Sequence, residues 1–217
     1  PRSSWVAVAL WAHLAAAPAT CRGDGPFSLS VSTVAELAAA IGPNRTIHLA
    51  AGDYDLSLPA APTDFVEWTG NRVEMRDVAH LTLEGPPTGE ARLYAPATFA
   101  LVFREARDLR LRGVVLGDSR RVTPRPLQPP IFDLVFDRTD GLRLEGLRVD
   151  RSARAALRFD GGEDLRLLDV QSAGVLSLEA RGSRSLYIER SSFLLAEGEP
   201  ALRLDAVRSA NLSRVTF

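Results

Sequence analysis

The sequence has a single cysteine, no lysine and no excess of charge of either sign. Cys21 is the one cysteine in 217 residues, so a disulfide bond within the chain is excluded. All 26 basic residues are arginines, which suit planar, bidentate contacts, although a genome rich in G and C accounts for the same bias. They nearly balance 27 acidic residues, so overall charge does not favour nucleic acid or an anionic membrane as a partner.

Long hydrophobic runs are also scarce. The apolar run from Trp5 to Ala17 is too short to span a membrane comfortably and is interrupted by His13. Arg2 precedes this run and small residues ending at Ala19 follow it, which is the pattern of a secretory signal whose initiator Met is missing. A short hydrophobic N-terminal helix is the alternative explanation of the same residues.

These features divide the chain into three parts. We expect a signal peptide over residues 1–19, a linker over residues 20–30 and one domain over residues 31–217, with the mature protein secreted or held in the cell envelope. Attachment to a lipid through Cys21 is the less favoured route to the envelope, because the residues before it depart from the lipidation signal.

One short phrase, as in His80-Leu-Thr-Leu-Glu-Gly85, recurs along the second half of the chain. Aligned on their second apolar residue, its copies are anchored at Leu83, Leu111, Leu144, Leu167, Ile188 and Leu212. The anchors are 28, 33, 23, 21 and 24 residues apart, so the last three intervals match one coil of a β-solenoid and the first two carry insertions. A second phrase lies upstream in each coil and ends at Arg104, Asp137, Asp160, Glu179 and Asp205.

Both phrases alternate apolar and polar residues, so each predicts a short strand with one buried face. A third apolar pair, such as Leu147 and Val149, completes a coil of three strands. Coils this short bury their apolar residues only by stacking on the coils above and below. We expect one buried column of Leu83, Leu111, Leu144, Leu167 and Ile188, and a second of Phe103, Phe136 and Phe159.

The N-terminal part of the domain predicts a short helix before the first coil. Thr33 and Glu36 have the spacing of a capping box, in which each side chain hydrogen-bonds the backbone N–H of the other residue. Helix-forming residues continue to Ala40, and Gly42 with Pro43 ends the helix. Such a helix covers the open end of a solenoid.

The segment from Val34 to Ser57, VAELAAAIGPNRTIHLAAGDYDLS, resembles the N-terminal segment of pectin-lyase-like right-handed β-helix proteins, and the repeats from Leu81 onward are similar to the repeats of that superfamily. The resemblance covers nearly everything after residue 30. It implies an all-β fold, a right-handed parallel β-helix built as a solenoid of three-strand coils with a short N-terminal capping α-helix. It implies less about chemistry, because one fold hosts many functions.

Three activities are implied by the resemblance: pectate or pectin lyase, polygalacturonase-type hydrolase, and epimerase. The hydrolase motifs N-T-D, D-D, G-H-G and R-I-K are absent, and neither His48 nor His80 lies between two glycines. The segment from Arg121 to Arg125 approaches the lyase motif R-x-P-x-x-R but fails its spacing. The sequence therefore identifies no catalytic residues, and an inactive or divergent protein is expected.

One column of outward residues is the main candidate binding site. Stacking of the first phrase places Thr82, Arg110, Arg143, Arg166 and Tyr187 above one another. Adjacent arginines repel unless an anion or an acidic neighbour lies among them, and Glu145 and Glu189 are two residues along. The column is interpreted as a stripe for an acidic polysaccharide, with Tyr187 stacking on a sugar ring. The alternative is a solvated sheet face whose charges neutralise one another.

The acidic residues of the second phrase are weak candidates for a metal site. Asp137 and Asp160 fall on successive coils, where two carboxylates can share Ca²⁺ or raise each other's pKa. The favoured alternative is that these acids end their strands and hydrogen-bond turn amides. We therefore expect no metal and no other cofactor.

Two insertions are candidates for the walls of a groove. The segment between Leu116 and Leu134 contains Arg121 and Arg125 among four prolines, and both arginines are included in the candidate glycan site. The segment from Pro59 to Thr69 carries Phe65 and Trp68. A site is expected where these loops overhang the arginine column. The alternative is that each insertion is a surface loop without a role in binding.

The leading hypothesis is a secreted solenoid that presents an extended surface to polysaccharide, without evident catalysis. A polysaccharide lyase or glycoside hydrolase with an atypical site is the second, and a structural or adhesive surface protein is the third. Leu204, Leu212, Val215 and Phe217 continue the apolar pattern to the end of the chain. We expect further C-terminal coils or end-to-end association to cover them, with a frayed last coil as the alternative.

Overall fold

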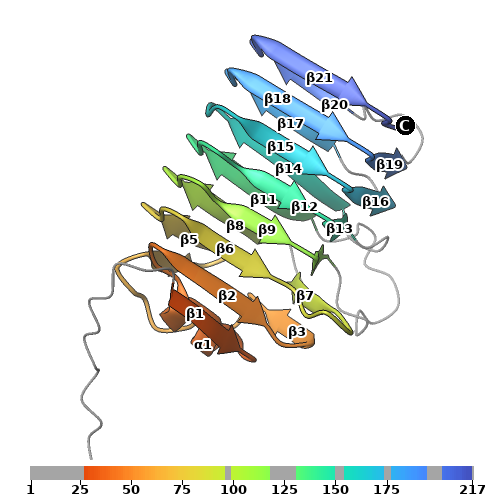
Figure 1. Cartoon of the computed structure of the whole chain (residues 1–217). Helices are drawn as coiled ribbons and strands as arrows, with labels where there is room; N and C mark the ends of the chain where they lie inside the picture. Colours follow the sequence, from red (N-terminus) through yellow and green to blue (C-terminus); the bar gives the residue numbers. More distant parts are fainter. Residues whose placement is uncertain are drawn as a thin grey trace, which may run out of the picture.

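The structure is a computed structural model that describes residues 27–95, 99–117, 131–149, 154–173, 177–194 and 202–216. Nearly all of these residues lie in or between the strands of three sheets, and the part of the chain described here contains one short helix. Each sheet takes one strand from each coil, and neighbouring strands in a sheet are one coil apart in the chain (Figure 1).

The largest sheet has eight strands. In spatial order they are β1 (Phe27–Val31), β2 (Arg45–Leu49), β6 (Leu81–Glu84), β9 (Arg110–Arg112), β12 (Arg143–Glu145), β15 (Leu165–Leu168), β18 (Ser185–Glu189) and β21 (Ser209–Ser213).

The other two sheets have seven and six strands. The seven-stranded sheet consists of β20 (Leu202–Asp205), β17 (Ser177–Arg181), β14 (Arg154–Asp160), β11 (Ile131–Asp137), β8 (Phe99–Arg104), β5 (Arg72–Arg76) and β4 (Val66–Thr69). The six-stranded sheet consists of β19 (Ser192–Leu194), β16 (Gln171–Ala173), β13 (Arg148–Val149), β10 (Val114–Leu116), β7 (Ala91–Tyr94) and β3 (Gly52–Asp55).

Strand pairing is parallel throughout the described residues except between β4 and β5, which form an antiparallel hairpin. Parallel strands normally need a long crossover connection, and here the rest of each coil supplies it. The result is the stack of coils seen in Figure 1, compatible with a β-helix-like solenoid. The prediction of an all-β, parallel fold with one short helix is confirmed.

Each coil turns its corners with single residues in the left-handed backbone conformation. At the corner that follows the seven-stranded sheet these residues are Asp77, Glu105, Arg138, Gly161, Gly182 and Ala206, with φ between 51° and 80°. At the corners from Asp77 to Gly182, the N–H donates to a carbonyl of the next coil, as from Glu105 to Asp137 at 2.9 Å and from Arg138 to Asp160 at 2.8 Å. The corners are therefore hydrogen-bonded between coils as the strands are, and the turns stack in register.

The interior is filled by columns of apolar side chains in register. Leu83, Leu111, Leu144, Leu167 and Ile188 pair directly along the eight-stranded sheet and are at most 1% exposed. Phe103, Phe136 and Phe159 pair along the seven-stranded sheet, and their rings are stacked. Both predicted columns are confirmed.

The helix α1 (Val34–Ala40) packs beside β1 and β2 at one end of the stack (Figure 1). Its capping box is present, since Thr33 Oγ1 accepts from the N–H of Glu36 at 3.1 Å and the Glu36 carboxylate accepts from the N–H of Thr33 at 3.2 Å. Strand β1 begins at Phe27, so residues 27–30 belong to the sheet and not to a linker.

The register of the seven-stranded sheet differs from the prediction at one coil. Arg181, and not Glu179, pairs with Asp160, and Glu179 lies opposite Arg158. The outward acidic column is therefore broken by a basic residue after Asp160. At the far end of the stack, Leu204 and Leu212 continue the inward columns opposite Ala180 and Ile188, and they are 39% and 43% exposed.

Candidate functional site

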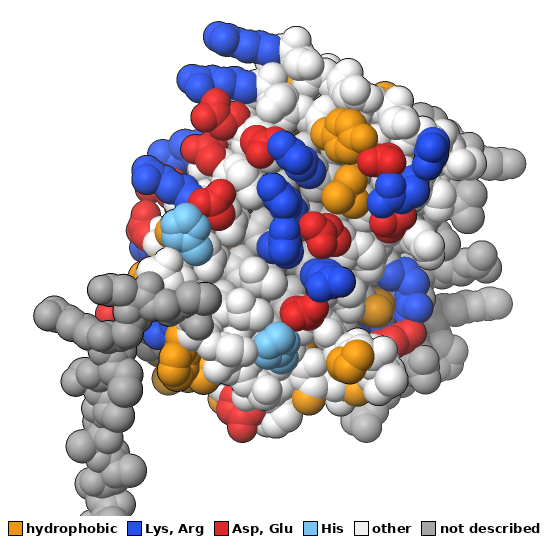
Figure 2. Space-filling model, in the orientation of Figure 1, with side chains coloured by type: hydrophobic (Ala, Val, Ile, Leu, Met, Phe, Trp, Pro, Cys, Tyr) orange, Lys and Arg blue, Asp and Glu red, His pale blue; other side chains and the backbone are white. Residues whose placement is uncertain are grey.

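The arginine column is present on the outer face of the eight-stranded sheet. Thr82 pairs with Arg110, Arg110 with Arg143, Arg143 with Arg166 and Arg166 with Tyr187. The predicted register of these five residues is thus confirmed. Acidic and basic side chains are interspersed over this face of the molecule (Figure 2).

Two of the three arginines have a carboxylate partner. Arg110 Nε lies 3.5 Å from Glu145 Oε1, and Arg166 Nε donates to Asp164 Oδ1 at 2.8 Å. The hydrogen bond to Asp164 raises the pKa of Arg166 above its ordinary value. These side chains are 38% and 45% exposed, so each ion pair is screened by water and leaves part of the guanidinium accessible.

Arg143 differs from both neighbours, because no carboxylate of the described residues lies within ion-pair distance of it. Asp108 and Asp164 occupy the corner two residues before Arg110 and Arg166, whereas the same corner before Arg143 holds Gly141. Gly141 has a φ of 66°, close to the left-handed φ of Asp108 and Asp164 at the same corner, and it carries no side chain that could contact Arg143. A glycine at this corner thus leaves Arg143 without the contact that Asp164 makes with Arg166.

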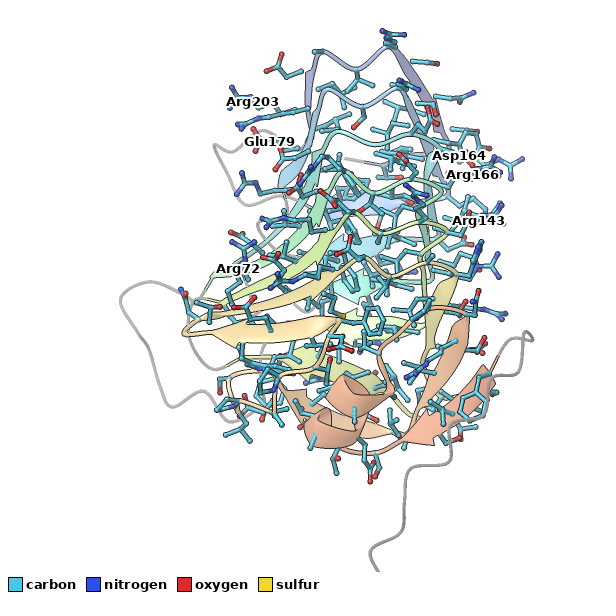
Figure 3. The ribbon with its side chains drawn as sticks, turned by 90° about the vertical axis from the view of Figure 1, so that its left-hand side faces the viewer. Arg72, Arg143, Asp164, Arg166, Glu179 and Arg203 are labelled. Atoms are coloured by element: carbon cyan, nitrogen blue, oxygen red, sulfur yellow. The ribbon has the colours of Figure 1, made fainter. Side chains whose placement is uncertain are left out.

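A shallow groove runs along the column at Arg143. Its volume is about 370 Å³, and its lining includes Thr82, Asp108, Arg110, Gly141 and Arg143. In Figure 3, Arg143 and Arg166 project from one side of the solenoid, and Arg72, Glu179 and Arg203 project from the opposite side. The column therefore offers guanidinium groups to a ligand that approaches this one face.

Tyr187 extends the column beyond Arg166. Its hydroxyl donates to Glu189 Oε2 at 2.8 Å, and this hydrogen bond raises the pKa of Tyr187 above its ordinary value. The hydroxyl is thereby held to the sheet, and the ring stays partly exposed at the outer face. Such a ring has the apolar surface on which a sugar ring stacks.

Of the two acidic candidates for a metal site, Asp137 is held by arginines. Asp137 accepts from Arg104 Nε at 2.9 Å and from Arg138 Nε at 3.4 Å, and Asp160 is flanked in register by Asp137 and Arg181. Within the described part of the chain, no three His, Cys, Asp or Glu side chains gather closely enough to hold a metal ion.

Of the two inserted segments, the structure describes the one from Pro59 to Thr69. Arg121 and Arg125 lie outside the described residues. The segment from Pro59 to Thr69 forms the strand β4 at the edge of the seven-stranded sheet, and Trp68 Nε1 donates to the carbonyl of Leu56 at 3.1 Å. The expectation that this insertion overhangs the arginine column is wrong, because the hairpin joins a different sheet.

A second polar group on the same sheet was missed in the sequence. His48 Nε2 lies 3.0 Å from Ser28 Oγ, and His48 Nδ1 lies 3.2 Å from Glu84 Oε2. The signal was the alternation of Phe27-Ser-Leu-Ser-Val31, which is that of a strand with outward serines. Assignment of these residues to a linker hid their position beside His48.

No protein-family model, no curated protein and no solved structure matches this chain. No helix among the described residues is long and apolar enough to cross a membrane. The sites are therefore interpreted from their own geometry and chemistry.

Proposed function

We propose that this protein binds an acidic polysaccharide along the arginine column of its eight-stranded sheet. The observation that carries the proposal is Arg143, an outward guanidinium in register between two others and without a carboxylate partner among the described residues. Guanidinium groups bind carboxylates in a planar, bidentate manner, and a cation flanked by like charges favours an anion beside it.

The repeat of the column suits a linear polyanion. Neighbouring strands are about 4.8 Å apart, so the three arginines span ~10 Å along the axis of the stack. A chain of uronic acids laid along this axis presents carboxylates at intervals of the same order, and Tyr187 continues the line with an aromatic ring. Because the arginines are partly exposed, the contacts should weaken as salt is added.

The proposal extends to the fold and the location of the protein. We infer that the coils wind right-handed, as in the pectin-lyase-like superfamily that the sequence resembles, because connections between parallel strands are right-handed in about 98% of cases. The signal-like residues 1–19 support export, which places the column where extracellular or envelope polysaccharides are found.

Affinity electrophoresis through gels that contain polygalacturonate, alginate or neutral dextran tests the proposal. The protein is expected to be retarded by an acidic glycan at low salt and released as salt rises. The double variant Arg110→Ala/Arg143→Ala should lose this retardation with little change in melting temperature, since both side chains are outward.

The matched control is Arg148→Ala/Arg203→Ala, which removes the same charge from the six-stranded and seven-stranded sheets. It should be retarded like the wild type. Equal loss in both variants would show a general charge effect, and the absence of retardation by every acidic glycan would refute the proposal.

A further inference from the structure

Four polar side chains from successive strands form a continuous chain of contacts at the N-terminal end of the eight-stranded sheet. They run from Ser28 on β1 through His48 on β2 and Glu84 on β6 to Arg112 on β9. The three contacts are 3.0 Å, 3.2 Å and 3.0 Å long. His48, Glu84 and Arg112 lie directly opposite one another in register, and Ser28 is diagonal to His48.

The carboxylate of Glu84 determines which nitrogen of His48 carries the proton. An ionised carboxylate only accepts hydrogen bonds, so the contact with Glu84 Oε2 requires a proton on His48 Nδ1. In the neutral ring Nε2 then has a lone pair, and it faces Ser28 Oγ at 3.0 Å. Ser28 therefore donates to His48, as a nucleophilic hydroxyl does to its general base.

Arg112 fixes the carboxylate. Its Nη1 donates to Glu84 Oε1 at 3.0 Å, which leaves Oε2 directed at His48. Arg112 therefore orients the carboxylate of Glu84, which in turn orients the imidazole of His48. Because all three residues lie on strands of one sheet, their relative positions are determined by the strand register.

A groove of about 600 Å³ begins at His48. Glu84 and Arg112 contribute to it with His48, and Leu49, Pro86 and Pro87 supply apolar surface. Gly85 also lines it, and a Cβ at this position would come within 2.1 Å of the carbonyl oxygen of Gly113. The base thus stands between an exposed serine and a partly apolar groove, which suits a small uncharged ligand with a polar reacting group.

From this geometry we propose that Ser28, His48 and Glu84 form a catalytic set that cleaves small carboxylic esters by acyl transfer to Ser28. Ser28 Oγ attacks the ester carbonyl carbon while its proton passes to His48 Nε2. The carbon–alkoxy bond breaks, and His48 returns the proton to the departing alcohol, which leaves an acyl group on Ser28. Water, deprotonated by His48, then releases the carboxylic acid and restores the serine.

The backbone of β1 supplies a donor for the oxyanion. The N–H of Phe27 donates to the carbonyl of Asn44 across the pair of strands. Alternate residues of a parallel strand bond to opposite sides, so the N–H of Ser28 points away from β2. Strand β1 is the last of its sheet within the described residues, and this N–H is directed to the outer edge beside the nucleophile.

Covalent labelling of the full chain with a fluorophosphonate, followed by peptide mass spectrometry, is the test. The label is expected on Ser28, together with hydrolysis of p-nitrophenyl acetate. Ser28→Ala should abolish both, His48→Gln should slow labelling roughly 100-fold or more, and Glu84→Gln should slow it by a smaller factor. All three side chains are outward, and an unchanged circular-dichroism melting curve verifies that each variant is folded.

His80→Gln is the matched control for the base. His80 Nδ1 contacts Asp108 Oδ2 at 2.9 Å, so it is a second exposed histidine paired with a carboxylate. Ser209→Ala, on β21 of the same sheet, is the control for the serine. Both should be labelled at the wild-type rate. Absence of label on Ser28, or equal labelling rates in His48→Gln and the wild type, would overturn the proposal, and ester hydrolysis that survives in Ser28→Ala would show reaction at histidine alone.

Discussion

Phe136 and Phe159, on neighbouring coils, are stacked with ring centroids 5.3 Å apart and ring planes 9° apart. Phe103 stacks on the other side of Phe136 at 5.5 Å, and all three rings are at most 1% exposed. Phe136 is therefore in contact with a ring on both sides. Its loss opens a cavity between two coils that cannot close independently, because their strands are hydrogen-bonded in register.

Phe136→Ala should lower the free energy of unfolding by about 3–5 kcal/mol. Phe136→Leu retains most of the buried volume and should cost clearly less. Urea unfolding followed by circular dichroism measures both changes. Equal losses of unfolding free energy in the two variants would contradict this prediction, because the cost would then not depend on the buried volume that each variant retains.

The corner glycines Gly162 and Gly182 predict different costs for the same substitution. Both have positive φ, at 88° and 62°. A Cβ on Gly182 would meet nothing within 4 Å, so Gly182→Ala should cost only the conformational strain of about 1–2 kcal/mol. A Cβ on Gly162 would lie 2.2 Å from the carbonyl oxygen of Thr139, and Gly162→Ala should cost more. Thermal unfolding of the two variants, measured side by side, compares strain alone with strain plus a backbone clash, and a smaller cost at Gly162 would contradict the described turn.

Asp133 predicts a pH dependence of stability. Burial raises its pKa above the ordinary value, and Arg158 opposes the shift only in part. Because the folded state holds this proton more tightly than the unfolded state, ionisation of Asp133 destabilises the fold as pH rises through the raised pKa. Asp133→Asn should therefore be more stable than the wild type at pH 7. The difference should vanish as pH falls below the ordinary aspartate pKa of about 3.9, which urea unfolding across this range measures.

The inward columns were predictable because the alternation of leucine and phenylalanine with polar residues marks one face of each strand. The register near Glu179 was not, since a shift by two residues leaves that alternation unchanged. Ala180 lies opposite Phe159, but its small side chain does not mark an inward position strongly enough in the sequence to distinguish the two registers.

The arginine column was predictable from the same pattern, but the special position of Arg143 was not. The aligned repeats already set Gly141 against Asp108 and Asp164, but only the structure shows that Arg110 contacts Glu145 and Arg166 contacts Asp164. Arg143 contacts no carboxylate of the described residues. The contact of Ser28 with His48 joins residues 20 positions apart across a pair of strands, and it required recognition of β1 as a strand.

Titration with galacturonate oligomers from the dimer to the hexamer tests the central claim most directly. Isothermal titration calorimetry at low salt should show affinity rising steeply until the oligomer spans the ~10 Å of the three arginines, and little beyond that length. Arg143→Gln should weaken binding of the longer oligomers by about tenfold, which corresponds to about 1.4 kcal/mol. An affinity that is independent of oligomer length, or unchanged by Arg143→Gln, would contradict the account.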